Sequence, residues 1–264
     1  MEIYNKKPYV ITIVILIILI LGLGGYIAYD KLLAKKEEAK VVTIVNDVKI
    51  NLNAFYQISS TLEKLDTAFN NNSSNYFGYI YKNKKLSIKN FDPNALLYAS
   101  VASDLIPSNT NQSIPGNKVK GNYEKMFGTN VKYNPITIIM NDTIKINYDK
   151  VNDIYTYNIP VNTSNYKSGY ITTNTKTVLE EDQIIITRKV FYVEYNGNGN
   201  DATKADVYTN SNKDYRLGSV SIKNGQANVY EVISKYGSRL NTFEYTFIKN
   251  SDEDYTLYRI EKIK

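Results

Sequence analysis

The chain has 264 residues with no His, no Cys and no Trp, and these absences exclude several classes of protein. Without His or Cys there is no imidazole base, no thiol nucleophile, no disulfide and no ordinary zinc or copper ligand set. The net charge of +6 comes from 32 Lys+Arg against 26 Asp+Glu, without the basic block typical of nucleic-acid binding. We therefore expect no cofactor, no metal site and no nucleic-acid partner.

The strongest local pattern is the apolar segment of residues 8–29, which contains no charged residue. As a helix this segment would be about 33 Å long, enough to cross a hydrocarbon core of about 30 Å. Tyr9, Tyr26 and Tyr29 stand near its two ends, where amphipathic rings favour the membrane interface. The sequence predicts a single-pass transmembrane helix whose partner is the lipid bilayer.

The orientation of this segment is not decided by charge, because basic residues nearly balance on its two sides. The short tail of residues 1–7 and the large part that follows favour a signal anchor. We expect a cell-membrane protein with its N-terminus inside and its C-terminal domain outside. A cleaved signal peptide is the alternative; Gly22 and Gly24 form the only small-x-small cleavage pattern, and the apolar run continues past them.

The part after the membrane segment divides by pattern into three regions. Residues 30–51 are predicted to be a stalk, with a short strand near residues 41–45. Residues 52–130 have helical periodicity and residues 131–264 have strand periodicity, and we expect 52–264 to form one extracytoplasmic unit.

Apolar residues spaced three and four apart predict the first helix of this unit, and the subsequent asparagine-rich loop ends it. Its apolar residues are Leu52, Phe55, Ile58, Leu62, Leu65 and Phe69. Asp92 before Pro93 predicts a second helix, which Pro107 stops, and residues 108–116 are predicted to be a loop. Asn117 is predicted to cap a third helix that ends at Gly128. Residues 228–236 are predicted to form a short fourth helix.

From Val131 the pattern changes to alternation of β-branched and aromatic residues, which predicts strands. The predicted strands are 136–140, 143–148, 154–159, 169–173, 184–195, 205–208, 216–222, 243–249 and 255–263. Helices followed by a mainly antiparallel sheet indicate an α+β fold rather than alternating βαβ units. In general layout only, such a chain resembles the cone-like folds of the nuclear-transport-factor-2 kind and the single-pass envelope proteins of A/T-rich bacteria.

Three short motifs in the β-rich part partly match known functional sites. Residues 194–200 supply oxygens and a glycine as a calcium loop does, but the final bidentate carboxylate is missing, which favours a hairpin loop. Ser164 and Lys167 have the Ser-x-x-Lys spacing of acyl-enzymes without the partner motifs. The acidic runs 180–182 and 252–254 are typical of solvated turns.

The 25 tyrosines leave an aromatic binding surface as the remaining candidate site. Aromatic rings stack on sugars and are favoured at protein interfaces, although the same rings could fill the faces of the sheet. The candidate surface residues are Tyr155, Tyr157, Tyr192, Tyr195 and Tyr245.

Two hypotheses follow from the sequence. The first is a non-enzymatic envelope protein whose outer domain binds a protein partner or a wall glycan. The alternative is a carboxylate-based envelope hydrolase, which would need an apolar-walled cleft with two convergent carboxyl groups of raised pKa.

Overall fold

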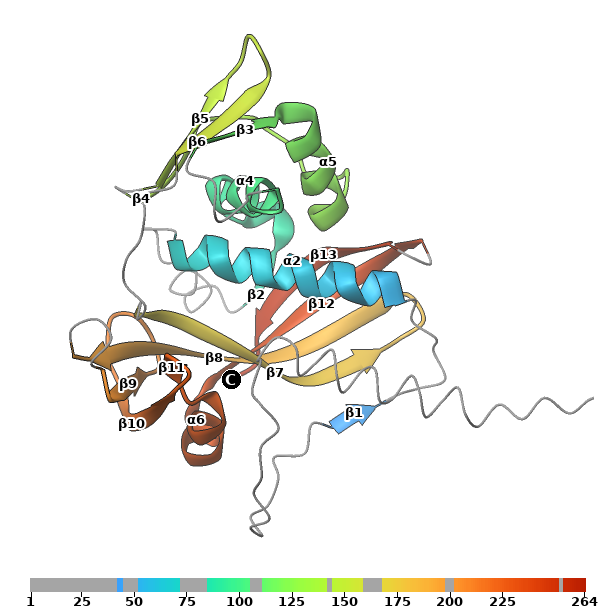
Figure 1. The fold of residues 1–264 in the computed structure, drawn as a ribbon. Helices are drawn as coiled ribbons and strands as arrows, with labels where there is room; N and C mark the ends of the chain where they lie inside the picture. Colours follow the sequence, from blue (N-terminus) through green and yellow to red (C-terminus); the bar gives the residue numbers. More distant parts are fainter. Residues whose placement is uncertain are drawn as a thin grey trace, which may run out of the picture. The chain divides into compact units, whose positions relative to one another are not determined.

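The computed structural model describes residues 42–44, 52–71, 85–104, 111–141, 144–158, 168–197, 202–251 and 254–264. By their contacts, Val41–Lys264 form one compact unit (Figure 1). The predicted membrane segment of residues 8–29 lies outside the described residues. Within the described ranges, no helix has both the length and the apolar character that a bilayer crossing demands.

Helices and strands alternate in the first part of this unit, and strands dominate the rest. The helices are α2 (Leu52–Asn71), α4 (Pro93–Ala102), α5 (Gly116–Phe127) and α6 (Val229–Tyr236), with 3₁₀ turns at η1 (Ile88–Asn90) and η3 (Gly237–Arg239). The early strands are β1 (Val42–Ile44), β2 (Lys85–Ser87), β3 (Asn111–Pro115), β4 (Ile138–Asn141), β5 (Ile144–Asp149) and β6 (Ile154–Asn158). The later strands are β7 (Gly169–Leu179), β8 (Gln183–Asn196), β9 (Lys204–Tyr208), β10 (Arg216–Lys223), β11 (Gln226–Ala227), β12 (Asn241–Ser251) and β13 (Asp254–Lys262).

The described strands form two sheets, and the fold is α+β with mostly antiparallel pairing, as predicted. The nine-stranded sheet has the order β11-β10-β9-β8-β12-β13-β2, with β7 on the other edge of β8 and β1 on β7. The four-stranded sheet has the order β3-β6-β5-β4 and lies beside α4 and α5 (Figure 1). Only the pair β1–β7 is parallel among the described strands.

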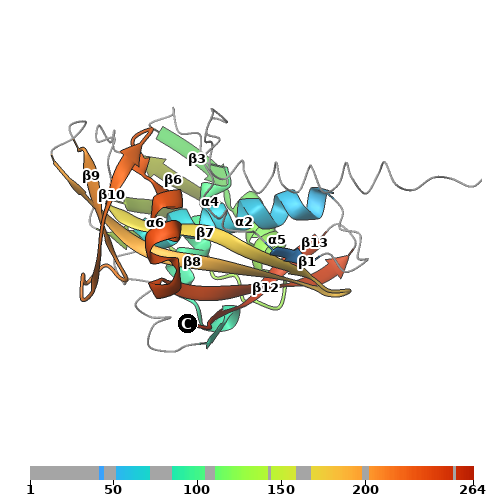
Figure 2. The same ribbon diagram turned by 90° about the horizontal axis from the view of Figure 1, so that it is seen from below.

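Strand β8 organises the large sheet because it changes its partner along its length. Its first half pairs with β12 and its last residues pair with β9, while β7 runs along its other edge. Alternate residues of a strand face opposite sides of a sheet. Ile184 and Ile186 therefore face the core under α2, whereas Phe191 and Val193 face the smaller core under α6. Figures 1 and 2 show α2 and α6 on opposite faces of this sheet.

The helix starts and ends were predicted in part. The side chain of Asp92 accepts a 2.9 Å hydrogen bond from the backbone N–H of Asn94 and caps α4, and Gly128 follows α5 with a φ of 83°, as expected. The prediction that Asn117 caps α5 was wrong, because the helix begins at Gly116 after Pro115.

The loop predicted for residues 108–116 is also corrected. Residues 111–115 form strand β3, which pairs with β6 although it has a polar, proline-ended sequence. Tertiary pairing with a neighbouring strand thus overrides the weak strand propensity of this segment.

Replacing Phe243 with Ala should lower the free energy of unfolding by about 3–5 kcal/mol, because the ring is fully buried between α2 and the sheet. Val151→Ala, at a turn residue that is 92% exposed, should change it by less than about 0.5 kcal/mol. Denaturant unfolding of the purified full-length chain, followed by circular dichroism, measures both. Equal effects for the two variants would contradict the assigned core.

Candidate functional site

Helix α2 has an apolar face and a polar face, and the polar face forms one wall of the candidate site. Its apolar face is buried against the sheet and the other helices through Ala54, Ile58, Leu62, Leu65 and Ala68. A polar face follows the same helical spacing at positions 53, 56, 57 and 60. One helix therefore both closes the core and presents a row of polar groups.

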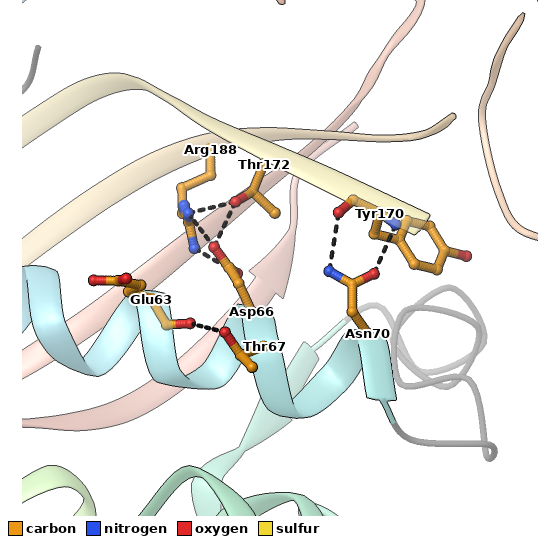
Figure 3. A network of polar contacts seen from close by, with 7 residues as sticks. All are labelled: Glu63, Asp66, Thr67, Asn70, Tyr170, Thr172 and Arg188. Carbon is orange, nitrogen blue, oxygen red and sulfur yellow. Dashed lines mark hydrogen bonds and ion pairs between the residues drawn. The ribbon is translucent and has the colours of Figure 1, made fainter. Parts of the chain in front are cut away.

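The C-terminal half of α2 is fixed to the sheet by a buried ion pair (Figure 3). Arg188 of β8 donates two hydrogen bonds to Asp66, at 2.9 Å to Oδ1 and 2.7 Å to Oδ2. Thr172 of β7 donates to Asp66 Oδ2 at 2.6 Å and accepts from Arg188 at 2.5 Å. The side chain of Arg188 is only 7% exposed, so this bidentate pair is held away from solvent.

The surroundings of Arg188 keep it charged. Burial disfavours the cation, but the facing carboxylate of Asp66 outweighs this and raises the pKa of Arg188. The guanidinium also lies 5.2 Å over the ring of Tyr245, and burial raises the pKa of the Tyr245 hydroxyl.

Asn70 makes a second connection at the end of α2. Its amide donates to the backbone O of Tyr170 at 2.9 Å, and its Oδ1 accepts from the backbone N–H of Tyr170 at 2.7 Å (Figure 3). The side chain of Asn70 thus pairs with the edge of β7 as a neighbouring strand would. Together with Asp66 it fixes the axis of α2 across the sheet.

The opposite wall of the site comes from α5 and the end of α4. Asn122 of α5 donates to the backbone O of Ser100 at 3.0 Å and to Asp104 Oδ2 at 2.6 Å. Lys118 forms an ion pair with the same Asp104 at 2.6 Å. These contacts hold α5 against α4, and they place Asn122, one turn before Lys125 and Met126, on the face toward α2.

Gln57 connects α2 to α5 and to strand β13. Its Nε2 donates to the backbone O of Lys125 at 3.0 Å, to Asp254 Oδ1 at 2.7 Å and to the backbone O of Tyr255 at 3.2 Å. Its Oε1 is buried and has no hydrogen-bond partner among the described residues. An unsatisfied buried acceptor is costly, so this wall has an unused capacity to accept a hydrogen bond.

A groove of about 540 Å³ remains between these walls. Its size is within the range of about 300–1,000 Å³ that small-molecule sites occupy. The groove is lined by Asn53, Tyr56, Gln57, Ser60, Thr61, Ser103, Asn122, Lys125 and Met126. The lining is thus mainly amide and hydroxyl groups, with one aromatic ring, one thioether and a single charged side chain.

Three of the five tyrosines predicted to form a binding surface are buried in the structure. Tyr155, Tyr157 and Tyr245 are buried, at 0%, 6% and 0% exposure, and so they fill the core. Tyr192 and Tyr195 are half-buried on β8. No ring among these five lines the groove, which instead uses Tyr56, a residue that is 50% exposed.

The tyrosines of the small sheet form a packed cluster. The rings of Tyr148 and Tyr155 are 4.7 Å apart, and the hydroxyl groups of Tyr133 and Tyr155 are 3.3 Å apart. Burial raises the pKa of Tyr155, and it raises the pKa of neighbouring Tyr123 to about 12. These hydroxyl groups are therefore neutral at physiological pH and act as uncharged hydrogen-bond partners.

Glu194 and Glu244, two acidic residues of the predicted strands, do not form the pair of facing carboxyl groups that a hydrolase would need. Glu244 pairs with Thr187 on β8, and Glu194 lies seven residues further along that strand, roughly 23 Å away. Glu194 instead contacts Lys213 at 2.6 Å. Within the described ranges, no group of three His, Cys, Asp or Glu side chains could hold a metal ion. Ser164 and Lys167 lie outside those ranges.

Several acidic side chains show lowered pKa values. Hydrogen bonds from Lys235 and Ser221 lower the pKa of Glu231 to about 2. Burial opposes the charge of Asp206, but hydrogen bonds from Arg216 and Ser219 outweigh it and lower its pKa. A general acid needs a raised pKa, and these environments do the opposite.

No protein-family model, curated protein or solved structure matches this chain. The site therefore has to be interpreted from its own geometry and chemistry.

The groove residues were missed by sequence reasoning, which followed only the apolar face of α2. The signal was present in the polar residues at the i, i+3, i+4 and i+7 positions of the same helix, Asn53, Tyr56, Gln57 and Ser60. The residues of the opposite wall could not be found this way, because their approach to α2 depends on tertiary packing.

Asp66→Ala should destabilise the chain by about 3–5 kcal/mol, because it leaves the buried cation of Arg188 without its partner. The double variant Asp66→Leu/Arg188→Met should recover a large part of this loss, because no buried charge remains. Chemical denaturation of the full-length chain measures each value.

Lys85→Ala is the control for this series. It removes a 3.3 Å contact with Glu261 at a side chain that is 56% exposed, and it should cost less than about 1 kcal/mol. An Asp66→Ala variant as stable as Lys85→Ala would show that the buried pair does not fix α2.

Proposed function

We propose that this chain is a single-pass, membrane-anchored envelope protein whose outer α+β domain binds an envelope protein or a wall glycan without catalysis. The observation that carries the proposal is the groove between α2 and α5, which is large enough for a ligand and is lined mainly by neutral polar groups. Such groups orient and recognise a ligand, and the hydroxyls among them become nucleophiles only when a neighbouring base activates them.

The membrane anchor rests on the sequence of residues 8–29, which combines a sufficient length with the absence of charge. The N-terminus would lie inside and the domain outside. We further propose that the large sheet with α2 across one face follows a cone-like layout. Support for it comes from the antiparallel pairing and from the long β8 that changes partner.

The charges of the domain favour binding over hydrolysis. Among the described residues, the carboxyl groups with a shifted pKa are Asp149, Asp206 and Glu231, and hydrogen bonds that stabilise the anion lower the pKa of each. Glu194 and Glu244 are too far apart for the separation of about 5–10 Å used by glycosidases. These features support a ligand-binding role for the mainly uncharged groove.

The anchor predicts that a reporter fused after Lys264 is active outside the cell and that the intact chain sediments with membranes. Deleting residues 8–29 should move the protein to the soluble fraction. Alkaline carbonate extraction of membranes and a pair of reporters, one active only inside and one only outside, measure both results. An intact chain in the soluble pool, or a cytoplasmic reporter signal, would refute the anchored topology.

The binding role predicts that the detergent-solubilised full-length chain, immobilised on beads, retains a component of purified cell envelope. Protein and glycan fractions are applied separately, and beads carrying the heat-denatured chain are the control. Retention of neither fraction would remove the proposed function.

A further inference from the structure

We infer that the groove between α2 and α5 binds an uncharged polysaccharide segment, with a sugar ring stacked on Tyr56 and its hydroxyl groups hydrogen-bonded to the surrounding amides and hydroxyls. This inference rests on the proposed function, because it names the ligand of the same site. It selects the glycan from the two classes of partner that the proposed function leaves open.

The chemistry of the lining selects a neutral and polar ligand. Six of the nine lining residues carry a carboxamide or an aliphatic hydroxyl: Asn53, Gln57, Ser60, Thr61, Ser103 and Asn122. Carboxamides and hydroxyls both donate and accept, which matches the mixed donor and acceptor character of sugar hydroxyls. A protein partner is usually anchored by several buried aromatic or Arg side chains, and this lining offers one ring and no Arg.

Tyr56 supplies the apolar contact that a sugar ring needs. It lies one helical turn from Asn53 and from Ser60, so polar groups flank the ring on both sides along α2. The residue is 50% exposed and therefore presents ring surface to the groove without first leaving the core. A pyranose has an apolar C–H face and a polar rim, which fit an aromatic ring bordered by amides and hydroxyls.

Polar atoms at the base of the groove give independent support for a ligand. Thr61 lines the groove although it is only 2% exposed. Gln57 is held by three bonds through Nε2, while its Oε1 has none. Buried polar groups are normally paired, so the unpaired Oε1 of Gln57 in this groove indicates a hydrogen bond that a ligand or a ligand-bound water completes.

The single charge of the lining argues against an anionic polymer. Lys125 is exposed at the rim, and polymers of phosphate groups are normally held by several cations along a track. Its backbone O, rather than its ammonium group, is what holds Gln57. Binding of an uncharged ligand should therefore not depend on salt, whereas binding of an anionic one should, and this separates the two by experiment.

The test measures binding of two uncharged tetrasaccharides to the full-length chain in detergent by isothermal titration calorimetry. The probes are the β-1,4-linked tetramers of glucose and of N-acetylglucosamine, and we expect at least one to bind. Tyr56→Ala should weaken this binding at least about tenfold, whereas Tyr56→Phe, which keeps the ring, should stay within about twofold of the unchanged chain.

A matched variant and a salt series complete the test. Tyr230→Ala removes a tyrosine that is 57% exposed on α6, outside the groove, and should leave binding unchanged. Binding should also not depend on salt between 50 and 500 mM, in contrast to about a tenfold loss per phosphate contact for an anionic ligand over such a range. Equal thermal unfolding of all variants confirms that they are folded.

The outcomes separate this inference from the proposed function. A chain that retains envelope protein but binds neither tetrasaccharide overturns the inference and leaves the proposed function intact. Loss of binding at high salt, or equal losses in Tyr56→Ala and Tyr230→Ala, overturns the inference as well. A chain that retains no envelope fraction and no tetrasaccharide overturns both.

Discussion

The buried ion pair between Asp66 and Arg188 is the contact on which the arrangement of the domain depends. It joins a helix to a strand 122 residues later in the chain, and its bidentate geometry fixes both distance and rotation. A buried pair seldom adds net stability over an apolar replacement, because both charges must leave water. Its value here is positional: Thr172 and Asn70 secure the same half of α2, so the helix can occupy only one place on the sheet.

The groove follows from this fixed position. With its C-terminal half secured to β7 and β8, α2 presents its N-terminal half toward α5, where Gln57 connects it to Lys125 and to β13. The α5 wall is itself held by Asn122 against the end of α4. The polar side chains of the two helices are thereby placed before any ligand arrives, which reduces the entropy cost of binding.

Local patterns in the sequence predicted most elements but not the contacts between them. The apolar spacing of α2, the Asp92 cap of α4 and the alternation in β8 and β12 are local signals, and each predicted the correct element. Strands β2 and β3 were missed because they are short and polar and exist only through pairing with β13 and β6. Tyr155 and Tyr245 were expected at a binding surface but are buried, for a related reason. The alternation of the sequence shows that they share a face of their strand with apolar neighbours, but it does not show that other elements cover that face. The pairing of Asp66 with Arg188 leaves no local trace at all.

The polarity of the groove supports a role in ligand binding, because the stability of the fold does not require polar side chains there. Contacts between two helices are usually filled by apolar side chains, and Ile58, Leu62 and Leu65 already provide such a contact on the other face of α2. Since Asp66 and Asn70 also hold this helix, apolar residues at positions 53, 56 and 60 could have closed the space against α5 and buried more surface. Instead the chain keeps amides, hydroxyls and an exposed ring there, with the Oε1 of Gln57 unsatisfied beneath them. A local departure from the rules of stable packing is expected where a protein performs its function, and this departure coincides with the groove that could hold a ligand.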